Sequence, residues 1–359
     1  MSPSILHVVG ARPNFMKAAP VIRALSTHDV EQFVVHTGQH YDRAMSDVFF
    51  VQLGLPEPDV NLGVGSGSHA QQTAALMTGM EQQLLEQRPA LVVVYGDVNS
   101  TLAAALVASK LQIPVAHVEA GLRSFDLTMP EEINRRVTDN LSSLLFVTSP
   151  EGIAYLAREG VEPGAMHLVG NPMIDTLLGN LERFDPGRVR ADLGIGGRYA
   201  VSTLHRPANV DDPATARAIV AALRDVGGSL PVIIPLHPRG RESLRRAGLD
   251  DAEGVRIVDP LGYVEFLSLV RGASLVLTDS GGIQEETTIL DVPCLTIRPN
   301  TERPITISHG TNQLVAPGEV SKEALAILDG TTRFPTQRPP LWDGQAGPRI
   351  ARIIAALYG

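Results

Sequence analysis

Apolar runs that alternate with longer amphipathic segments are the feature that most restricts how this chain can fold. Each run is short enough and apolar enough for a buried strand, and a helix-like stretch separates it from the next. This order predicts βαβ units with parallel strands. The predicted strands are 5–10, 33–37, 91–97, 114–120, 143–149 and 166–170, followed by 198–204, 231–236, 255–259, 274–279 and 292–297.

The strands fall into two sets, which predicts an α/β protein with two Rossmann-like domains. A chain of 359 residues with 44% hydrophobic residues exceeds what one core usually supports. A Gly- and Pro-rich boundary near 185–198 places the hinge between 171 and 197. We therefore expect an N-terminal domain over 1–170, a hinge and C-terminal domain over 171–340, and a final helix over 341–359 that crosses back to the first domain.

Composition excludes several classes of protein. The formal net charge of -9 argues against non-specific nucleic-acid binding, which needs a basic face. No apolar run approaches the roughly 18 residues of a membrane span, and no signal peptide is recognisable, so we expect a cytoplasmic protein without a membrane partner. A single cysteine, Cys294, excludes an intrachain disulfide and a cysteine-based metal cluster. We expect no metal, and the lone Gly10 in the first βα turn disfavours a nicotinamide cofactor.

Polar residues gather where the predicted strands end. Ligands of open α/β sheets bind beyond the carboxyl ends of the strands, so these positions indicate one cleft between two facing domains. Each position alone also has a simpler explanation. Arg12 and Lys17 could be surface charges, and two adjacent glycines form ordinary tight turns. His7, inside the first strand, is more typical of a core histidine than of a ligand.

Seven motifs in a fixed order carry a family resemblance: GARPNFMKAAPV, HTGQHYD, GDVNSTLAAAL, HVEAGLRSFDLTMPEEINRRVTD, HRPANVDDP, TDSGGIQEE and TERP. They span nearly the whole chain. Together they resemble the non-hydrolysing UDP-N-acetylglucosamine 2-epimerases. The resemblance implies a glycosyltransferase-B-like fold, a homodimer, a UDP-amino sugar substrate and no cofactor.

The resemblance also implies a mechanism. The C2 proton is removed, UDP leaves C1 to give 2-acetamidoglucal, and UDP adds again with protonation on the opposite face of C2. The product, UDP-N-acetylmannosamine, would serve cell-surface polysaccharide synthesis. Inversion at C2 needs acid and base groups on two sides of the ring. By motif matching, the catalytic residues are Asp97, Glu119, Glu131 and His205.

Motif matching assigns the binding residues as well. The predicted substrate-binding residues are Arg12, Lys17, Arg135, His237, Ser280, Gly281, Gly282 and Glu286. Arg12, Lys17 and His205 are expected near the diphosphate, Ser280 and its two glycines at the phosphates through a helix N-terminus, and Glu286 at the ribose. For Arg135, a structural ion pair within the acidic cluster is an equally open interpretation.

Bacterial members of the family have a second site for a substrate effector. The matching residues here are Gln39, Gln72 and Arg206. The chain departs from the family pattern at Ala208, where glutamate is common, and at Asn140, where histidine is common. Loss of a carboxylate at Ala208 predicts weaker coupling between effector and active site.

Other functions remain open at this stage. A hydrolysing 2-epimerase shares the elimination step, and a 2-epimerase of a modified UDP-amino sugar shares the motifs. A retaining glycosyltransferase or an inactive nucleotide-sugar sensor could use the same fold. The three carboxylates Asp97, Glu119 and Glu131 disfavour the last two, because neither function requires inversion at C2.

Overall fold

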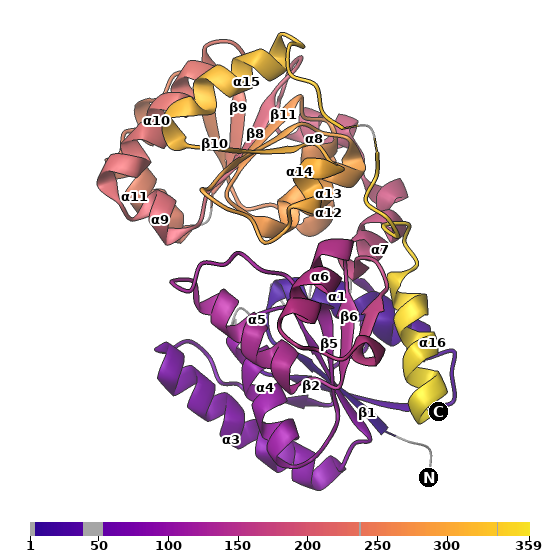
Figure 1. Ribbon diagram of the computed structural model, residues 1–359. Helices are drawn as coiled ribbons and strands as arrows, with labels where there is room; N and C mark the ends of the chain where they lie inside the picture. The colour runs from indigo at the N-terminus through magenta and orange to yellow at the C-terminus, as the bar shows by residue number, and fades with distance from the viewer. Residues whose placement is uncertain (1–3, 39–52, 237, 336) are drawn as a thin grey trace. The chain divides into compact units, whose positions relative to one another are not determined.

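The computed structural model describes residues 4–38, 53–236, 238–335 and 337–359 (Figure 1). The chain divides into two compact units. Unit 1 runs to Gly179 and also contains Pro340–Gly359, whereas unit 2 is Asn180–Pro339.

Unit 1 contains, within its described residues, a seven-stranded parallel sheet in the order β3-β2-β1-β4-β5-β6-β7. Its strands are β1 (Ser4–Val9), β2 (Glu31–His36), β3 (Val60–Asn61), β4 (Leu91–Tyr95), β5 (Val115–Ala120), β6 (Leu144–Val147) and β7 (Met166–Leu168). Six of them match predicted strands. The additional edge strand, β3, has only two residues, and one of them is polar.

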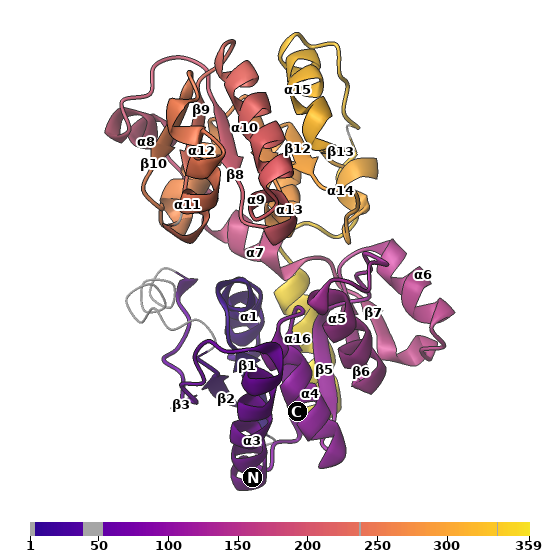
Figure 2. The same ribbon diagram turned by 90° about the vertical axis from the view of Figure 1, so that its left-hand side faces the viewer.

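The helices of unit 1 cover both faces of this sheet (Figures 1 and 2). They are α1 (Arg12–Leu25), α3 (His69–Gln87), α4 (Asn99–Lys110), α5 (Pro130–Leu141), α6 (Pro150–Arg158), α7 (Pro172–Gly179) and α16 (Ala346–Tyr358). Helices α3 and α4 bury Met80, Leu84 and Ala104 against Leu6 and Val92 of the central strands. Helices α1, α7 and α16 pack together as a separate group.

The C-terminal helix α16 packs on α1 at close range. A Cβ atom on Gly347 would lie 2.6 Å from the carbonyl oxygen of Pro20, so only glycine permits this approach. Ile350 and Ile354 are fully buried in the same contact region of unit 1. The C-terminal helix thus returns to the N-terminal Rossmann-like unit, as the sequence predicted.

Unit 2 contains, within its described residues, a six-stranded parallel sheet in the order β10-β9-β8-β11-β12-β13. Its strands are β8 (Ala200–Thr203), β9 (Val232–Pro235), β10 (Val255–Val258), β11 (Leu275–Thr278), β12 (Cys294–Ile297) and β13 (Asn312–Val315). The first five match the predicted strands. Two parallel Rossmann-like sheets confirm the predicted fold class.

Helices also flank the sheet of unit 2. They are α8 (Pro186–Asp192), α9 (Pro207–Val210), α10 (Pro213–Gly227), α11 (Pro238–Arg246), α12 (Tyr263–Arg271), α13 (Gly281–Leu290), α14 (Ile305–Ser308) and α15 (Val320–Leu328). The core of this unit joins strand residues such as Ile234 and Leu277 to Leu223 of α10 and Ala324 of α15. Among all described residues, no helix has the length and apolar character that crossing a bilayer would require.

Candidate functional site

A buried ion pair joins the first helix of unit 1 to its central sheet. Lys17 of α1 donates to the carboxylate of Glu119, which stands near the end of β5. Both side chains are almost fully buried. The backbone of Gly96 lies against the pair, because a Cβ atom there would be 2.8 Å from Lys17 Nζ and 3.2 Å from Glu119 Oε2. Two predicted site residues, 102 positions apart, therefore meet directly.

A second ion-pair cluster forms beside this pair, around Arg135 of α5. Arg135 Nη1 lies 2.5 Å from Asp97 Oδ2, and Nη2 lies 2.7 Å from Glu132 Oε2. Burial alone would raise the pKa of Glu132, but hydrogen bonds from Arg135 and Ser124 outweigh burial and hold the pKa below its ordinary value. Arg135 therefore pairs within the acidic cluster, and a direct role in substrate binding stays a prediction.

Adjacent glutamates at the start of α5 differ in environment. Glu132 is fully buried and accepts hydrogen bonds from the backbone N–H groups of Ser124 and Phe125, which fixes the loop before the helix. Glu131 is exposed in the first turn. An exposed carboxylate at a helix N-terminus is free to meet a ligand, which is compatible with the role that the motif assigns to Glu131.

A chain of side-chain amides leads from α3 to the Asp97 loop. Gln72 donates to the carbonyl oxygen of Gly65 at 2.9 Å and accepts from Asn99 at 2.8 Å. Asn134 donates to Asn99 Oδ1 at 3.3 Å and to the carbonyl oxygen of Asp97 at 2.8 Å. Gln72, a predicted effector residue, is thus connected to a predicted catalytic residue through Asn99 and Asn134, neither of which was predicted as a site residue.

In unit 2, Asp279 organises the loop that carries two predicted site residues. Its Oδ1 lies 2.8 Å from His205 Nδ1, and its carboxylate accepts the backbone N–H groups of His205 and Arg206. Asn209 donates to Asp279 Oδ2 at 3.1 Å and to the carbonyl oxygen of Ile297 at 3.0 Å. Burial alone would raise the pKa of Asp279, but the contacts with His205 and Arg206 hold it below its ordinary value.

Asp279 is fully buried, while the His205 side chain is 62% exposed. The aspartate therefore orients an imidazole whose other nitrogen can face a ligand. Asp279 was visible in the sequence, directly after a predicted strand. Its role in holding the His205 loop is evident only from the structure, because the two residues are 74 positions apart in the sequence.

The turn between β11 and α13 has the form of an anion site. Ser280 is the N-cap of α13, and Gly281 and Gly282 open the helix with half-exposed backbone. A Cβ atom on Gly281 would lie 2.6 Å from both Arg303 Nη1 and Glu302 Oε1, so glycine is required there. The N-terminus of a ten-residue helix presents backbone N–H groups that suit a phosphate.

Further predicted residues have simpler outcomes. Glu286 is buried in α13. Arg206 donates through Nε to the carbonyl oxygen of Asp279 at 2.9 Å. Arg12 begins α1, and Gln39 and His237 lie outside the described residues.

The core interpretation of His7 is confirmed. Its side chain is buried, its Nδ1 is hydrogen-bonded to the Tyr95 hydroxyl at 2.8 Å, and burial lowers its pKa to about 4.

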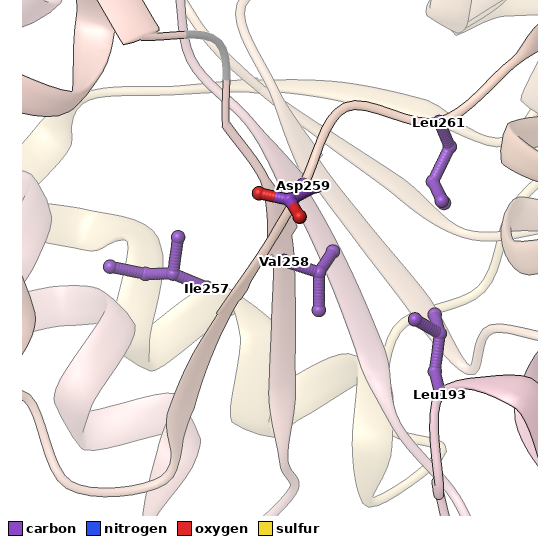
Figure 3. Close-up of a pocket in the computed structure, with 5 residues that line it drawn as sticks. All are labelled: Leu193, Ile257, Val258, Asp259 and Leu261. Atoms are coloured by element: carbon purple, nitrogen blue, oxygen red, sulfur yellow. The ribbon is translucent and has the colours of Figure 1, made fainter.

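A cavity of about 300 Å³ lies beside the end of β10 in unit 2 (Figure 3). Ile257, Val258, Asp259 and Leu261 line it from β10 and the segment that follows, and Leu193 lines it from the segment after α8. Its lining side chains are apolar apart from the Asp259 carboxylate. These side chains offer no cation to a diphosphate, which makes the α13 turn the better candidate for one.

The two units divide the chemistry between them. Unit 1 holds carboxylates paired with cations, which suits proton transfer, and unit 2 holds a histidine and a helix N-terminus, which suits an anion. Paired parallel Rossmann-like sheets with polar loops of this kind define a protein of the glycosyltransferase-B-like class.

Comparison with known proteins narrows this class to one family. The family model for UDP-N-acetylglucosamine 2-epimerase matches residues 23–355. A UDP-N-acetylglucosamine 2-epimerase of Methanocaldococcus jannaschii is 43% identical over 363 residues, covering 98% of each chain. A UDP-2,3-diacetamido-2,3-dideoxy-D-glucuronate 2-epimerase of Pseudomonas aeruginosa is 42% identical over 361 residues, covering 98% of this chain and 99% of the relative.

Solved structures agree with the sequence comparison. The M. jannaschii UDP-GlcNAc 2-epimerase in complex with UDP-GlcNAc and UDP superposes with a TM-score of 0.90 at 42% identity, covering 99% of this chain and 100% of the other. The enzyme of Neisseria meningitidis bound to UDP-GlcNAc gives a TM-score of 0.87 at 27% identity, with 99% of each chain covered. This chain belongs to the UDP-N-acetylglucosamine 2-epimerase family and is an epimerase.

Proposed function

We propose that this protein interconverts UDP-N-acetylglucosamine and UDP-N-acetylmannosamine without hydrolysing them. A base removes the C2 proton, the C1–O bond to UDP breaks, and the electron pair of the C2–H bond forms the C1=C2 bond of 2-acetamidoglucal. UDP then adds back to C1 while an acid protonates C2 from the opposite face. The oxidation state is the same before and after, so the reaction needs no redox cofactor.

The observation that carries this proposal is the pairing of carboxylates with cations at the ends of two neighbouring strands. Asp97 follows β4 and pairs with Arg135, and Glu119 stands in β5 and pairs with Lys17. These ion pairs fix the two carboxylates in place at adjacent strand ends. A carboxylate held in a fixed position can take a proton from a bound sugar and return one.

In the proposed roles, Asp97, Glu119 and Glu131 handle the C2 proton. Arg12, Lys17, His205, His237 and the Ser280–Gly282 turn stabilise the diphosphate, Glu286 binds the ribose, and Arg135 orients Asp97. Departure of UDP concentrates negative charge on its terminal phosphate. Fixed cations and helix N–H groups lower the barrier most when they meet charge that develops at this step.

Proton NMR of the enzyme with UDP-N-acetylglucosamine in deuterated water tests the proposal. The expected outcome is UDP-N-acetylmannosamine that carries deuterium at C2 and reaches equilibrium with the starting sugar, with no added NAD or metal. Free N-acetylmannosamine with UDP would instead select a hydrolysing enzyme. Absence of any product from this substrate would contradict the proposal.

A modified UDP-amino sugar is the second candidate substrate. The P. aeruginosa relative named for a diacetamido glucuronate substrate is 42% identical, almost the same as the 43% of the M. jannaschii relative. Overall identity therefore does not separate the two substrates. Parallel NMR assays with UDP-2,3-diacetamido-2,3-dideoxy-D-glucuronate compare their values of kcat/KM directly, and a higher value for the modified sugar would reverse the preference.

The remaining parts of the proposal concern the setting of the reaction. The enzyme acts in the cytoplasm as a homodimer and supplies precursors of cell-surface polysaccharides. UDP-N-acetylglucosamine also acts as an effector through Gln39, Gln72 and Arg206. Ala208 is exposed in the short helix α9 that follows Arg206, and we expect the effector response to be weak because this position lacks a carboxylate.

A further inference from the structure

Glu119 has a strained backbone. Its φ is 77°, in the left-handed region that residues with a side chain rarely occupy. The pairing of β5 with β6 shifts between Val118 and Ala120, so Glu119 is the extra residue of a β-bulge. Such a conformation costs about 1–3 kcal/mol and persists only where the surroundings enforce it.

Asp139 of α5 holds both ends of this bulge. Its Oδ1 accepts from His117 Nδ1 at 2.6 Å, two residues before Glu119. Its Oδ2 accepts the backbone N–H of Gly121 at 3.1 Å, two residues after Glu119. All three of these residues are buried. A single carboxylate therefore binds a side chain on one side of the strained position and a backbone N–H on the other.

His117 also connects this cluster to Gly96, which directly follows the neighbouring strand β4. Its second nitrogen, Nε2, lies 2.7 Å from the carbonyl oxygen of Gly96. Gly96 has a φ of 64°, precedes Asp97, and packs against both members of the Lys17–Glu119 pair. Movement of the imidazole would therefore disturb the backbone beside both carboxylates.

The His117 ring bridges two oxygen-bearing groups. A carbonyl oxygen only accepts, so Nε2 of His117 donates to Gly96. Asp139 also accepts from Gly121 N–H and from Arg123 Nη1 at 2.7 Å. Burial alone would raise the pKa of Asp139, but His117 and Arg123 hold it below its ordinary value. The imidazole ring thus links the Asp139 carboxylate to the Gly96 carbonyl oxygen.

We infer that Asp139 and His117 are positioning residues of the epimerase, which hold the β5 bulge so that the Glu119 carboxylate stays against Lys17 and Gly96. This inference rests on the proposed role of Glu119 in proton transfer. It differs from that role, because neither Asp139 nor His117 needs to touch the sugar.

The test compares two substitutions beside the same buried guanidinium. The Asp139 carboxylate accepts hydrogen bonds from three donors through its two oxygens. Asp139→Asn leaves only one oxygen that can accept. Glu159→Gln is the matched control, since Glu159 also pairs with Arg123, at 2.6 Å, but contacts neither His117 nor Gly121. Each substitution is measured alone and combined with Glu119→Gln, with kcat and KM for UDP-N-acetylglucosamine as the readout.

We expect Asp139→Asn to lower kcat about 10²-fold with little change in KM, the size of effect that a displaced catalytic group produces. In the Glu119→Gln background the same substitution should change kcat by less than about twofold, because its target is already gone. Glu159→Gln should leave kcat within about twofold. If Asp139→Asn and Glu159→Gln lower kcat equally, or if Asp139→Asn lowers kcat just as much in the Glu119→Gln background, Asp139 contributes only to general stability. Either result would overturn the inference.

Crystal structures of the same variants provide a readout that does not depend on activity. In Asp139→Asn, residue 119 should leave the left-handed region or its carboxylate should separate from Lys17, and in Glu159→Gln neither should change. If Asp139→Asn does not fold, His117→Gln takes its place, because a single amide nitrogen cannot occupy the positions of both imidazole nitrogens. An unchanged bulge in the folded variant contradicts the inference. If the bulge is displaced in the variant but the unaltered protein has no epimerase activity, only the proposed function is contradicted.

Discussion

The proposed roles divide single residues into a group that transfers protons and a group that binds UDP, and kinetics can separate the two groups. If Asp97, Glu119 and Glu131 transfer protons, changing each to its amide should lower turnover by about 10² to 10⁴-fold and leave UDP affinity nearly unchanged. His205→Ala should weaken UDP binding, because its exposed imidazole is oriented by Asp279. Calorimetry with UDP measures the affinity, and an equal loss of affinity in all four variants would contradict the division.

At this scale the sequence pointed to the candidate residues and to the pairing of Arg135 within the acidic cluster, but not to the pairing of Lys17 with Glu119. The motifs pointed to Lys17 and Glu119 separately, with Lys17 expected at the diphosphate. Their ion pair spans 102 positions and depends on how α1 packs over the sheet. The two anchoring carboxylates, Asp139 and Asp279, were invisible as anchors, because a buried carboxylate bound to backbone N–H groups looks in sequence like any other aspartate.

Among the elements of the fold, α16 is attached to α7 by a buried carboxylate. Asp175 of α7 accepts the backbone N–H groups of Ala346 and Gly347 at 3.1 and 2.7 Å, at the N-terminus of α16. Burial raises the pKa of Asp175 from 3.8 to about 6. The folded protein therefore binds this proton more readily than the unfolded chain, so the stability that the shift contributes is present below pH ~4 and is lost as the pH rises through ~6.

An asparagine at this position cannot titrate, which gives a direct test. We expect the free energy of unfolding of the unaltered protein, minus that of Asp175→Asn, to fall as the pH is raised from about 4 to 7. Urea unfolding followed by tryptophan fluorescence measures it, since the only tryptophan of the chain, Trp342, is buried just before α16 and donates to the carbonyl oxygen of Thr148. Asp192→Asn, at an exposed position that pairs with Arg188 on α8, is the surface comparison. A flat difference at Asp175 would contradict the prediction.

Strands that form a continuous apolar run could be predicted from the sequence, and strands without one could not. All eleven predicted strands are present, because each forms a short apolar run and most are largely buried parallel strands. The sequence did not reveal β3 or β13. The first has two residues, and the second begins with Asn312 and Gln313 at an edge of its sheet, so neither forms an apolar run.

On the scale of the whole molecule, the two units are built differently. Unit 2 is one continuous segment, Asn180–Pro339, with its own core. Unit 1 is discontinuous and needs the C-terminal segment, in which Trp342, Ile350 and Ile354 are buried. Each such side chain contributes about 1.5–3 kcal/mol, against a total of about 5–15 kcal/mol for a typical domain. Removing 340–359 should therefore destabilise unit 1 severely.

Unit 2 should, in contrast, fold when produced alone as residues 180–339. Its sheet, its core and the loop contacts between His205 and Asp279 all lie within this segment, and so does the α13 turn. We expect the isolated segment to unfold in one cooperative transition and to bind UDP more weakly than the full chain does, because the contacts proposed for Arg12 and Lys17 are missing. Circular dichroism and UDP calorimetry measure both properties, with His205→Ala as a control that removes the exposed imidazole held by Asp279. A folded segment that shows no UDP binding at millimolar concentration would mean that the diphosphate is held by unit 1, and would reverse the proposed division of roles.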